Sequence, residues 1–111
     1  MKIARHNFSL VSFGGCLYAL GGFGHTYLAS CEVYDPTTNK WTDIANMSQG
    51  RVSMGVAVSH SSIIMVGGWE EGDGSVESSS AELFNPATNT WVQLPSMKKK
   101  RLGKFTFDWN I

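Results

Sequence analysis

The sequence predicts an all-β protein made of two consecutive four-stranded antiparallel units and the first strand of a third. Three observations lead to this prediction: a repeat with a period close to 50 residues, short apolar stretches that end at turn residues, and no stretch with the apolar spacing of a helix. The repeat carries the most weight, because a missed period would misplace every other motif.

The repeat is visible in two spacings. The paired glycines Gly21-Gly22 recur 46 residues later as Gly67-Gly68, whereas the second half of the unit repeats at 50 residues. The change from 46 to 50 places four additional residues in the Gly/Ser/Glu-rich stretch 69–81, which is predicted to be an exposed loop. The other recurring pairs are Arg5 and Arg51, Glu32 and Glu82, Pro36 and Pro86, Asn39 and Asn89, Trp41 and Trp91, Met47 and Met97, and Arg51 and Arg101.

Each unit is predicted to contain four short strands. Both hairpins between the third and fourth strands, at 35–39 and 85–89, carry an Asx-Pro pair and a second Asn, which is typical of tight turns. The predicted strands are 6–13, 16–20, 31–34 and 40–44 in the first unit, and 52–59, 62–66, 81–84 and 90–94 in the second. The chain, 1–111, is accordingly divided into repeat one at 5–50, repeat two at 51–100 and a partial third repeat at 101–111.

Composition and charge argue against several classes of partner. Nine basic and nine acidic side chains give a formal net charge of zero, so we expect no general attraction to nucleic acid or to an acidic membrane surface. The sequence has no apolar stretch of transmembrane length, and its N-terminus lacks the apolar region of a secretory signal. A cytoplasmic protein with reduced, packed Cys16 and Cys31 is therefore predicted, and the basic run 98–101 is expected to be a solvated link.

The recurring motifs resemble the kelch repeat. Glu32-Val33-Tyr34-Asp35-Pro36 with Trp41, and Glu82-Leu83-Phe84-Asn85-Pro86 with Trp91, follow the Gly-Gly pairs and the leading arginines in the order of that family. The resemblance implies a β-propeller of usually six blades, of which this chain is a partial arc. Segments 22–26 and 55–58 are most similar to kelch-like proteins that join a BTB domain to a propeller and recruit substrates to cullin-based ubiquitin ligases.

That resemblance implies a non-enzymatic module for protein interaction, with no cofactor. Two alternatives stay open: an enzymatic kelch propeller of the copper-oxidase or sugar-processing class, and an actin-binding kelch protein. A metal site is not expected, because His6, His25 and His60 occupy different phases of the repeat.

Ten residues are predicted to serve the fold rather than a ligand. Paired glycines at a strand end permit positive φ or close backbone approach, and large rings fill the space between neighbouring sheets. These structural residues are Gly21, Gly22, Gly67, Gly68, Glu32, Glu82, Tyr34, Phe84, Trp41 and Trp91.

Two groups of residues are candidates for binding a partner. One group lies on the loops after the second strand of each unit, where function in a propeller is expected, and its Trp and acids suit a basic peptide or an arginine. The other consists of the arginines that open each unit, for which the residues leave an even alternative, pairing with Glu32 or Glu82 inside the chain. The candidates are Phe23, His25, Tyr27, Trp69, Glu70, Glu71 and Asp73 on the loops, and Arg5, Arg51 and Arg101 at the unit starts.

An arc of two blades is expected to expose faces that are meant for other blades. The chain also begins in phase with a repeat, because Met1 and Arg5 are spaced as Met47 and Arg51 are, so Met1 need not be a natural start. We therefore expect either missing blades or self-association, in which three copies would supply six blades. Segment 104–110 is predicted to be an unpaired strand edge.

Overall fold

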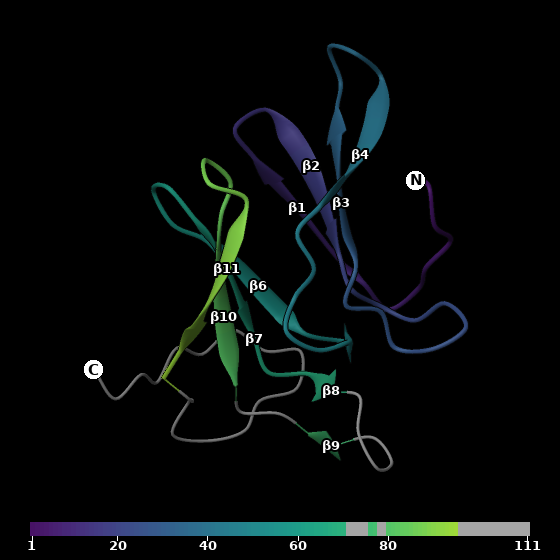
Figure 1. The fold of residues 1–111 in the computed structure, drawn as a ribbon, viewed down its shortest axis with the longest axis vertical. Coiled ribbons are helices and arrows are strands. Elements are labelled where there is room, and N and C mark those ends of the chain that lie inside the picture. The colour runs from purple at the N-terminus through teal and green to yellow at the C-terminus, as the bar shows by residue number, and fades with distance from the viewer. Residues whose placement is uncertain (71–75, 78–79, 96–111) are drawn as a thin grey trace.

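The computed structural model describes residues 1–70, 76–77 and 80–95, and all regular structure in them is β-strand (Figure 1). The strands form two four-stranded antiparallel sheets and one small three-stranded sheet. They are β1 (Ser9–Phe13), β2 (Cys16–Leu20), β3 (Cys31–Asp35), β4 (Lys40–Ile44), β5 (Arg51–Val52), β6 (Gly55–Val58), β7 (Ile63–Val66), β8 (Trp69–Glu70), β9 (Val76–Glu77), β10 (Ala81–Asn85) and β11 (Thr90–Leu94). The predicted all-β fold with two four-stranded units is confirmed, and the predicted strand of a third unit lies outside the described residues.

The first sheet has its strands in chain order, β1-β2-β3-β4, as expected for consecutive hairpins. Its β3–β4 turn uses the predicted Asx chemistry: Asp35 Oδ1 accepts hydrogen bonds from the Thr37 N–H at 2.9 Å and from the Thr37 hydroxyl at 2.7 Å. Asn39 takes a φ of 56° and donates its N–H to Asp35 O at 2.8 Å. The Asn at this position is therefore required by backbone that most residues avoid.

The second sheet has the same arrangement, with β6, β7, β10 and β11 as neighbours in that order. The prediction of one continuous first strand at 52–59 is wrong, because Ser53 has a φ of 53° and interrupts the ladder between β5 and β6. Asn7, at the same position of the first repeat, has a φ of 54°, and β1 begins only at Ser9. Left-handed backbone cannot continue a strand, so β1 and β6 both begin after this kink.

The stretch 69–81 is also more ordered at its start than an exposed loop. In the small sheet, β8 pairs with β5 on one side and with β9 on the other, with Trp69 opposite Val52 and Glu77. The first repeat has isolated bridges at the corresponding positions, His6 with Phe23 and Phe23 with Tyr27. The alternation of apolar and polar residues is too short here to reveal a two-residue strand from the sequence.

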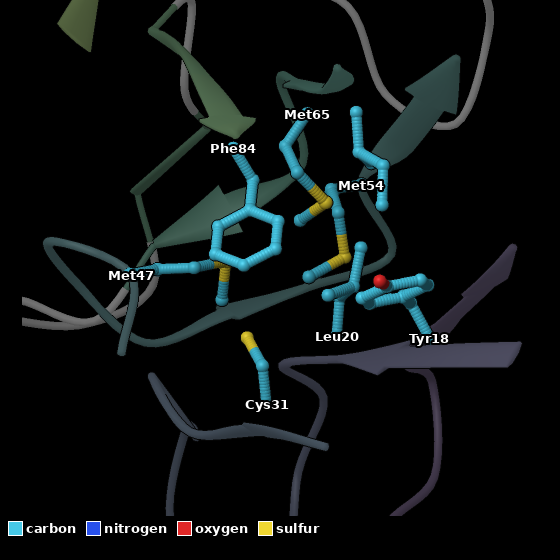
Figure 2. Packing of buried hydrophobic residues seen from close by; sticks show 8 residues of the cluster. Tyr18, Leu20, Cys31, Met47, Met54, Met65 and Phe84 are labelled. Carbon is cyan, nitrogen blue, oxygen red and sulfur yellow. The ribbon is translucent and has the colours of Figure 1, made fainter. Parts of the chain in front are cut away.

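The hydrophobic core fills the space between the two large sheets (Figure 2). Side chains from both sheets, and from the link between them, meet there, and burial of each large one contributes roughly 2–3 kcal/mol. The members are Tyr18, Leu20 and Cys31 from the first sheet, Met47 from the link, Met54 from the segment before β6, and Ile63, Met65 and Phe84 from the second sheet. The two repeats are thus joined by one continuous seam.

Gly21 and Cys31 show how tightly the seam is packed. Gly21 has a φ of 63°, and a Cβ on it would lie 2.6 Å from Met54 Cε and 2.9 Å from Arg51 O. Burial raises the pKa of the Cys31 thiol to about 12, so this thiol stays protonated and acts as a small apolar group. Both cysteines are free, as the sequence predicts.

Candidate partner-binding site

The arginine that opens the second repeat is buried in the seam. Only 1% of the Arg51 side chain is exposed, and its Nη2 and Nε lie 2.8 Å and 3.3 Å from Oε2 of Glu82. Arg51 Nη1 donates to the Ser80 hydroxyl at 2.9 Å. Glu82 also accepts from the N–H and the hydroxyl of Ser48, so the carboxylate connects β10 to the link between the repeats.

The arginine of the first repeat has a closely similar environment. Arg5 Nη2 lies 2.9 Å from Oε2 of Glu32, both side chains are fully buried, and Nη1 donates to the carbonyls of Gly21 and Ser30 at 2.8 Å. Burial alone would raise the pKa of the Glu32 carboxyl, but hydrogen bonds from the Lys2 N–H, the guanidinium and the Ile3 N–H outweigh it and hold the pKa below its ordinary value.

Of the two alternatives for these arginines, the structure has the intramolecular one. A carboxylate that is buried on β3 or β10 must be paired with a cation. The arginine that opens the same repeat is the cation that reaches it. The guanidinium groups of Arg5 and Arg51 are therefore engaged within the chain, and their expected place on a partner-binding face stays a prediction. The hydroxyls of Ser30 and Ser80 also contact these arginines, which was not predicted from the sequence. The 50-residue spacing of the two serines could have identified them.

The loop ends of the blades, opposite the hairpin turns in Figure 1, carry the other candidates. In the first repeat a hollow of about 600 Å³ opens between the N-terminal segment and the loop 23–28. Its walls are mainly apolar, with two imidazoles. The lining residues are Ile3, Ala4, Arg5, His6, Phe23, Gly24, His25, Thr26 and Leu28.

Phe23 lines this hollow. Its ring lies 5.4 Å from the ring of His6 and 5.8 Å from that of Tyr27, so the Phe23 ring has an aromatic neighbour on the N-terminal segment and another on its own loop. His25 is exposed at the rim. Phe23, His25 and Tyr27 lie on one loop, and their role in binding a partner stays a prediction. The structure adds His6 beside Phe23, and the position of His6 in the repeat gave no signal because its counterpart is the apolar Val52.

Trp69 is the counterpart of Phe23 in the second repeat, 46 residues later. It is half-buried on β8, and β8 lies at the same loop end of the molecule (Figure 1). For Glu70 only the strand position is described, and Glu71, Asp73 and Arg101 lie outside the described residues.

The predicted structural rings form two equivalent pairs. Tyr34 and Trp41 lie 5.1 Å apart at an interplanar angle of 40°, and Phe84 and Trp91 lie 4.9 Å apart at 41°. Only the second pair is in the seam, where Trp91 Nε1 donates to Ala45 O at 2.8 Å. The first pair is on the outer face of the first sheet.

Over residues 1–70, 76–77 and 80–95, no three His, Cys, Asp or Glu side chains gather in a way that could hold a metal ion. Nor do these residues form a helix with the length and apolar character that a membrane span requires.

Comparison with known proteins agrees with this geometry. A family model for the kelch motif matches residues 4–48 and 50–98. Kelch-like protein 15 of Danio rerio is 43% identical over 68 residues, covering 60% of this chain and 11% of that protein. Kelch-like protein 23 of Mus musculus is 42% identical over 69 residues, 61% of this chain and 12% of that protein.

The chain spans about a tenth of the length of these relatives. The motif match, however, covers both repeats and nearly every residue of the two sheets and their seam. The chain therefore belongs to the kelch-repeat family, and its two four-stranded sheets are blades of a β-propeller.

Proposed function

We propose that this chain is a non-enzymatic protein-interaction module that holds a protein or peptide ligand at the loop end of its blades. The observation that carries this proposal is the hollow of about 600 Å³ around Phe23. A mainly apolar concavity with a few polar groups at its rim suits an apolar ligand side chain held in orientation by hydrogen bonds. The arginine–glutamate pairs and the seam are committed to packing, which leaves the loops for recognition.

A more specific role follows from the relatives. The matched proteins are named kelch-like proteins 15 and 23, and the resemblance of segments 22–26 and 55–58 is to propellers that recruit substrates to cullin-based ubiquitin ligases. We propose that the ligand of this chain is such a substrate and that the chain acts in the cytoplasm.

The Phe23 ring sets the expected cost of substitutions in ligand binding. Buried aromatic anchors dominate many protein interfaces, and removal of one costs about 2 kcal/mol or more, which corresponds to about 30-fold in affinity. Phe23→Ala should therefore weaken ligand binding most. His25→Ala should weaken it less, because His25 is exposed and contributes only rim contacts.

The test is quantitative capture of cell proteins on the immobilised chain, followed by titration of each captured protein in purified form. Val58→Ala is the matched control, because Val58 is 46% exposed and lies at the opposite, hairpin end of the blade. The proposal predicts a ligand that binds wild type and Val58→Ala equally and loses affinity with Phe23→Ala. Equal affinity for all variants would contradict the site.

The adaptor role has its own readout. In cells, the ubiquitin conjugates of the captured ligand should decrease when the Phe23→Ala chain replaces wild type. Unchanged conjugates together with lost binding would contradict the adaptor role and leave the interaction module intact.

A further inference from the structure

Each large sheet ends in an outer strand that has a neighbour on one side only, β4 in the first blade and β11 in the second. Among the described residues no strand pairs with the outer edge of either one, so the backbone N–H and C=O groups on that edge have no ladder partner. Such an edge is a template onto which another extended chain can pair. Because β4 and β11 are related by 50 residues, the two edges can be compared position by position.

The two edges differ in charge. β4 carries Lys40 and Asp43, and Lys2 adds an ion pair to Asp43 at 3.0 Å. The counterparts on β11 are Thr90 and Gln93, so this strand, Thr-Trp-Val-Gln-Leu, has no charged residue. Charged side chains are a common means of keeping an edge strand from pairing with another chain. The edge of β4 is protected in this way, and the edge of β11 is not.

β11 is also the more apolar edge. Val92 is 53% exposed at the middle of the strand, where β4 has Thr42. Thr42 is opposite Val33, which packs on the seam, yet Thr42 itself is exposed. This position of the outer strand therefore lies outside the area that a packed blade covers. An apolar side chain placed over Val92 would bury apolar surface and so favour binding.

A groove of about 420 Å³ opens beside β11. It is lined by Gln93 of this strand and by Asn46 and Ser48 of the link between the blades, among others. In the first repeat the positions of Ser48 and Gln93 hold Lys2 and Asp43, whose ion pair joins the two elements. The groove beside β11 is thus open at the place where the first repeat has a salt bridge.

The groove presents neutral polar groups. The side-chain amides of Asn46 and Gln93 make no hydrogen bond among the described residues, and Asn89 uses only its Oδ1, which accepts from a backbone N–H at 2.8 Å. Of the lining residues that the structure describes, only Glu82 is charged, and it is 1% exposed and paired with Arg51. An uncharged polar side chain of a partner can bond to the free amides, whereas a charged one would be desolvated without a counter-ion.

We propose that the outer edge of β11 binds an uncharged, extended segment of a partner protein, which adds to the four-stranded second sheet as a further strand. Side chains of a strand alternate between the two faces of its sheet. Polar side chains of the bound segment therefore lie beside Gln93 and the groove, and the apolar ones between them cover Val92. Backbone hydrogen bonds give such a complex its affinity, and the alternating side chains give it selectivity. None of these residues lines the hollow around Phe23, and the inference is independent of the proposed function.

The test uses random peptides of about nine residues, long enough for one strand, displayed on phage and selected on the Phe23→Ala chain so that the hollow contributes little. A double variant, Thr90→Lys with Gln93→Asp, gives β11 the two charges of β4. Both positions are exposed and β4 holds the same residues, so the double variant should match wild type in circular dichroism and thermal unfolding. Selected peptides should bind it on the order of tenfold or more weakly than wild type. Val58→Lys is the matched control, because Val58 is 46% exposed but lies on β6, and affinity should be unchanged.

Changes in the peptide backbone test strand addition without relying on how any variant folds. N-methylation of one peptide amide removes its hydrogen-bond donor, and in an added strand only every second N–H faces β11. Affinity for wild type should therefore fall about tenfold at alternate residues and change little at the residues between them. A selection that yields no peptide, equal affinity for the double variant, or losses without a period of two would overturn the proposal. Sedimentation in which β11 pairs with a second copy, so that the double variant abolishes self-association and no peptide competes, would overturn it as well.

Discussion

The same cluster of a buried arginine and a buried glutamate, the arginine corner, occurs twice in this molecule. Arg51 and Glu82 form it in the seam, and Arg5 and Glu32 form it in the first blade, where no preceding repeat covers it. Arg51 donates from Nε to Glu82, whereas Arg5 Nε is buried and has no acceptor among the described residues. The corner of Arg51 is covered by Tyr27 and Leu28 of the preceding repeat, and the corner of Arg5 lines the hollow. The same repeat motif therefore has two roles. Its arginine and glutamate pack inside their own blade, and the residues around the arginine form part of the surface that the preceding blade covers.

The largest effect should come from the buried carboxylate of the seam. Glu82→Ala leaves Arg51 as an uncompensated buried charge, so the free energy of unfolding should fall by about 3–5 kcal/mol in urea titration. Asp43→Ala is the control, because its bond to Lys2 joins side chains that are 53% and 61% exposed, and the change should stay within about 0.5 kcal/mol. Similar losses for both variants would refute the importance of burial at this corner.

The next largest effect should come from giving Arg51 the preceding residue that Arg5 has, which is alanine instead of glycine. Gly50→Ala places a Cβ against the backbone of Tyr27, which has to move, at a cost of about 1–3 kcal/mol. The reciprocal change, Ala4→Gly, removes only an exposed methyl and should cost less than about 1 kcal/mol. Thermal unfolding of the two variants compares them directly, and equal midpoints would show that the corner tolerates a methyl.

A smaller difference is expected between the two tryptophans. Trp91→Phe removes the donor to Ala45 O, which should cost about 1 kcal/mol in chemical unfolding. Trp41→Phe removes an indole N–H without an acceptor in the described residues and should be nearly neutral. If Trp41→Phe were the more destabilising variant, the assignment of the open face would be wrong.

The smallest effect is on acid stability and concerns Glu32. Because the folded-state pKa of Glu32 lies below its ordinary value of 4.5, its ionised form stabilises the fold above that pH. This stability is lost as the pH falls below 4.5 and through the lower folded-state pKa. Glu32→Gln should flatten the pH dependence of unfolding in this range, and a profile as steep as that of wild type would assign the acid sensitivity to other groups.

The repeated spacing predicted most of the fold. The strand order, the Asx turns at Asp35 and Asn85 and the joined sheets all follow from local chemistry that occurs twice. The kink at Ser53 was not predictable from its own residue type, since serine has no special preference for positive φ. Whether the arginines pair within the chain or face a partner depended on which carboxylate was buried. Burial of a carboxylate is a property of the folded protein and not of the local sequence.

The central claim is that the two ring pairs differ because one is enclosed in the seam and the other is open. One measurement tests this claim directly. Hydrogen exchange of the indole N–H groups can be followed by NMR on ¹⁵N-labelled protein, at a concentration low enough to keep the chain monomeric. The Trp91 indole should exchange at least about tenfold more slowly than that of Trp41, because only Trp91 has its acceptor in the seam. Equal exchange at the two indoles would contradict the account.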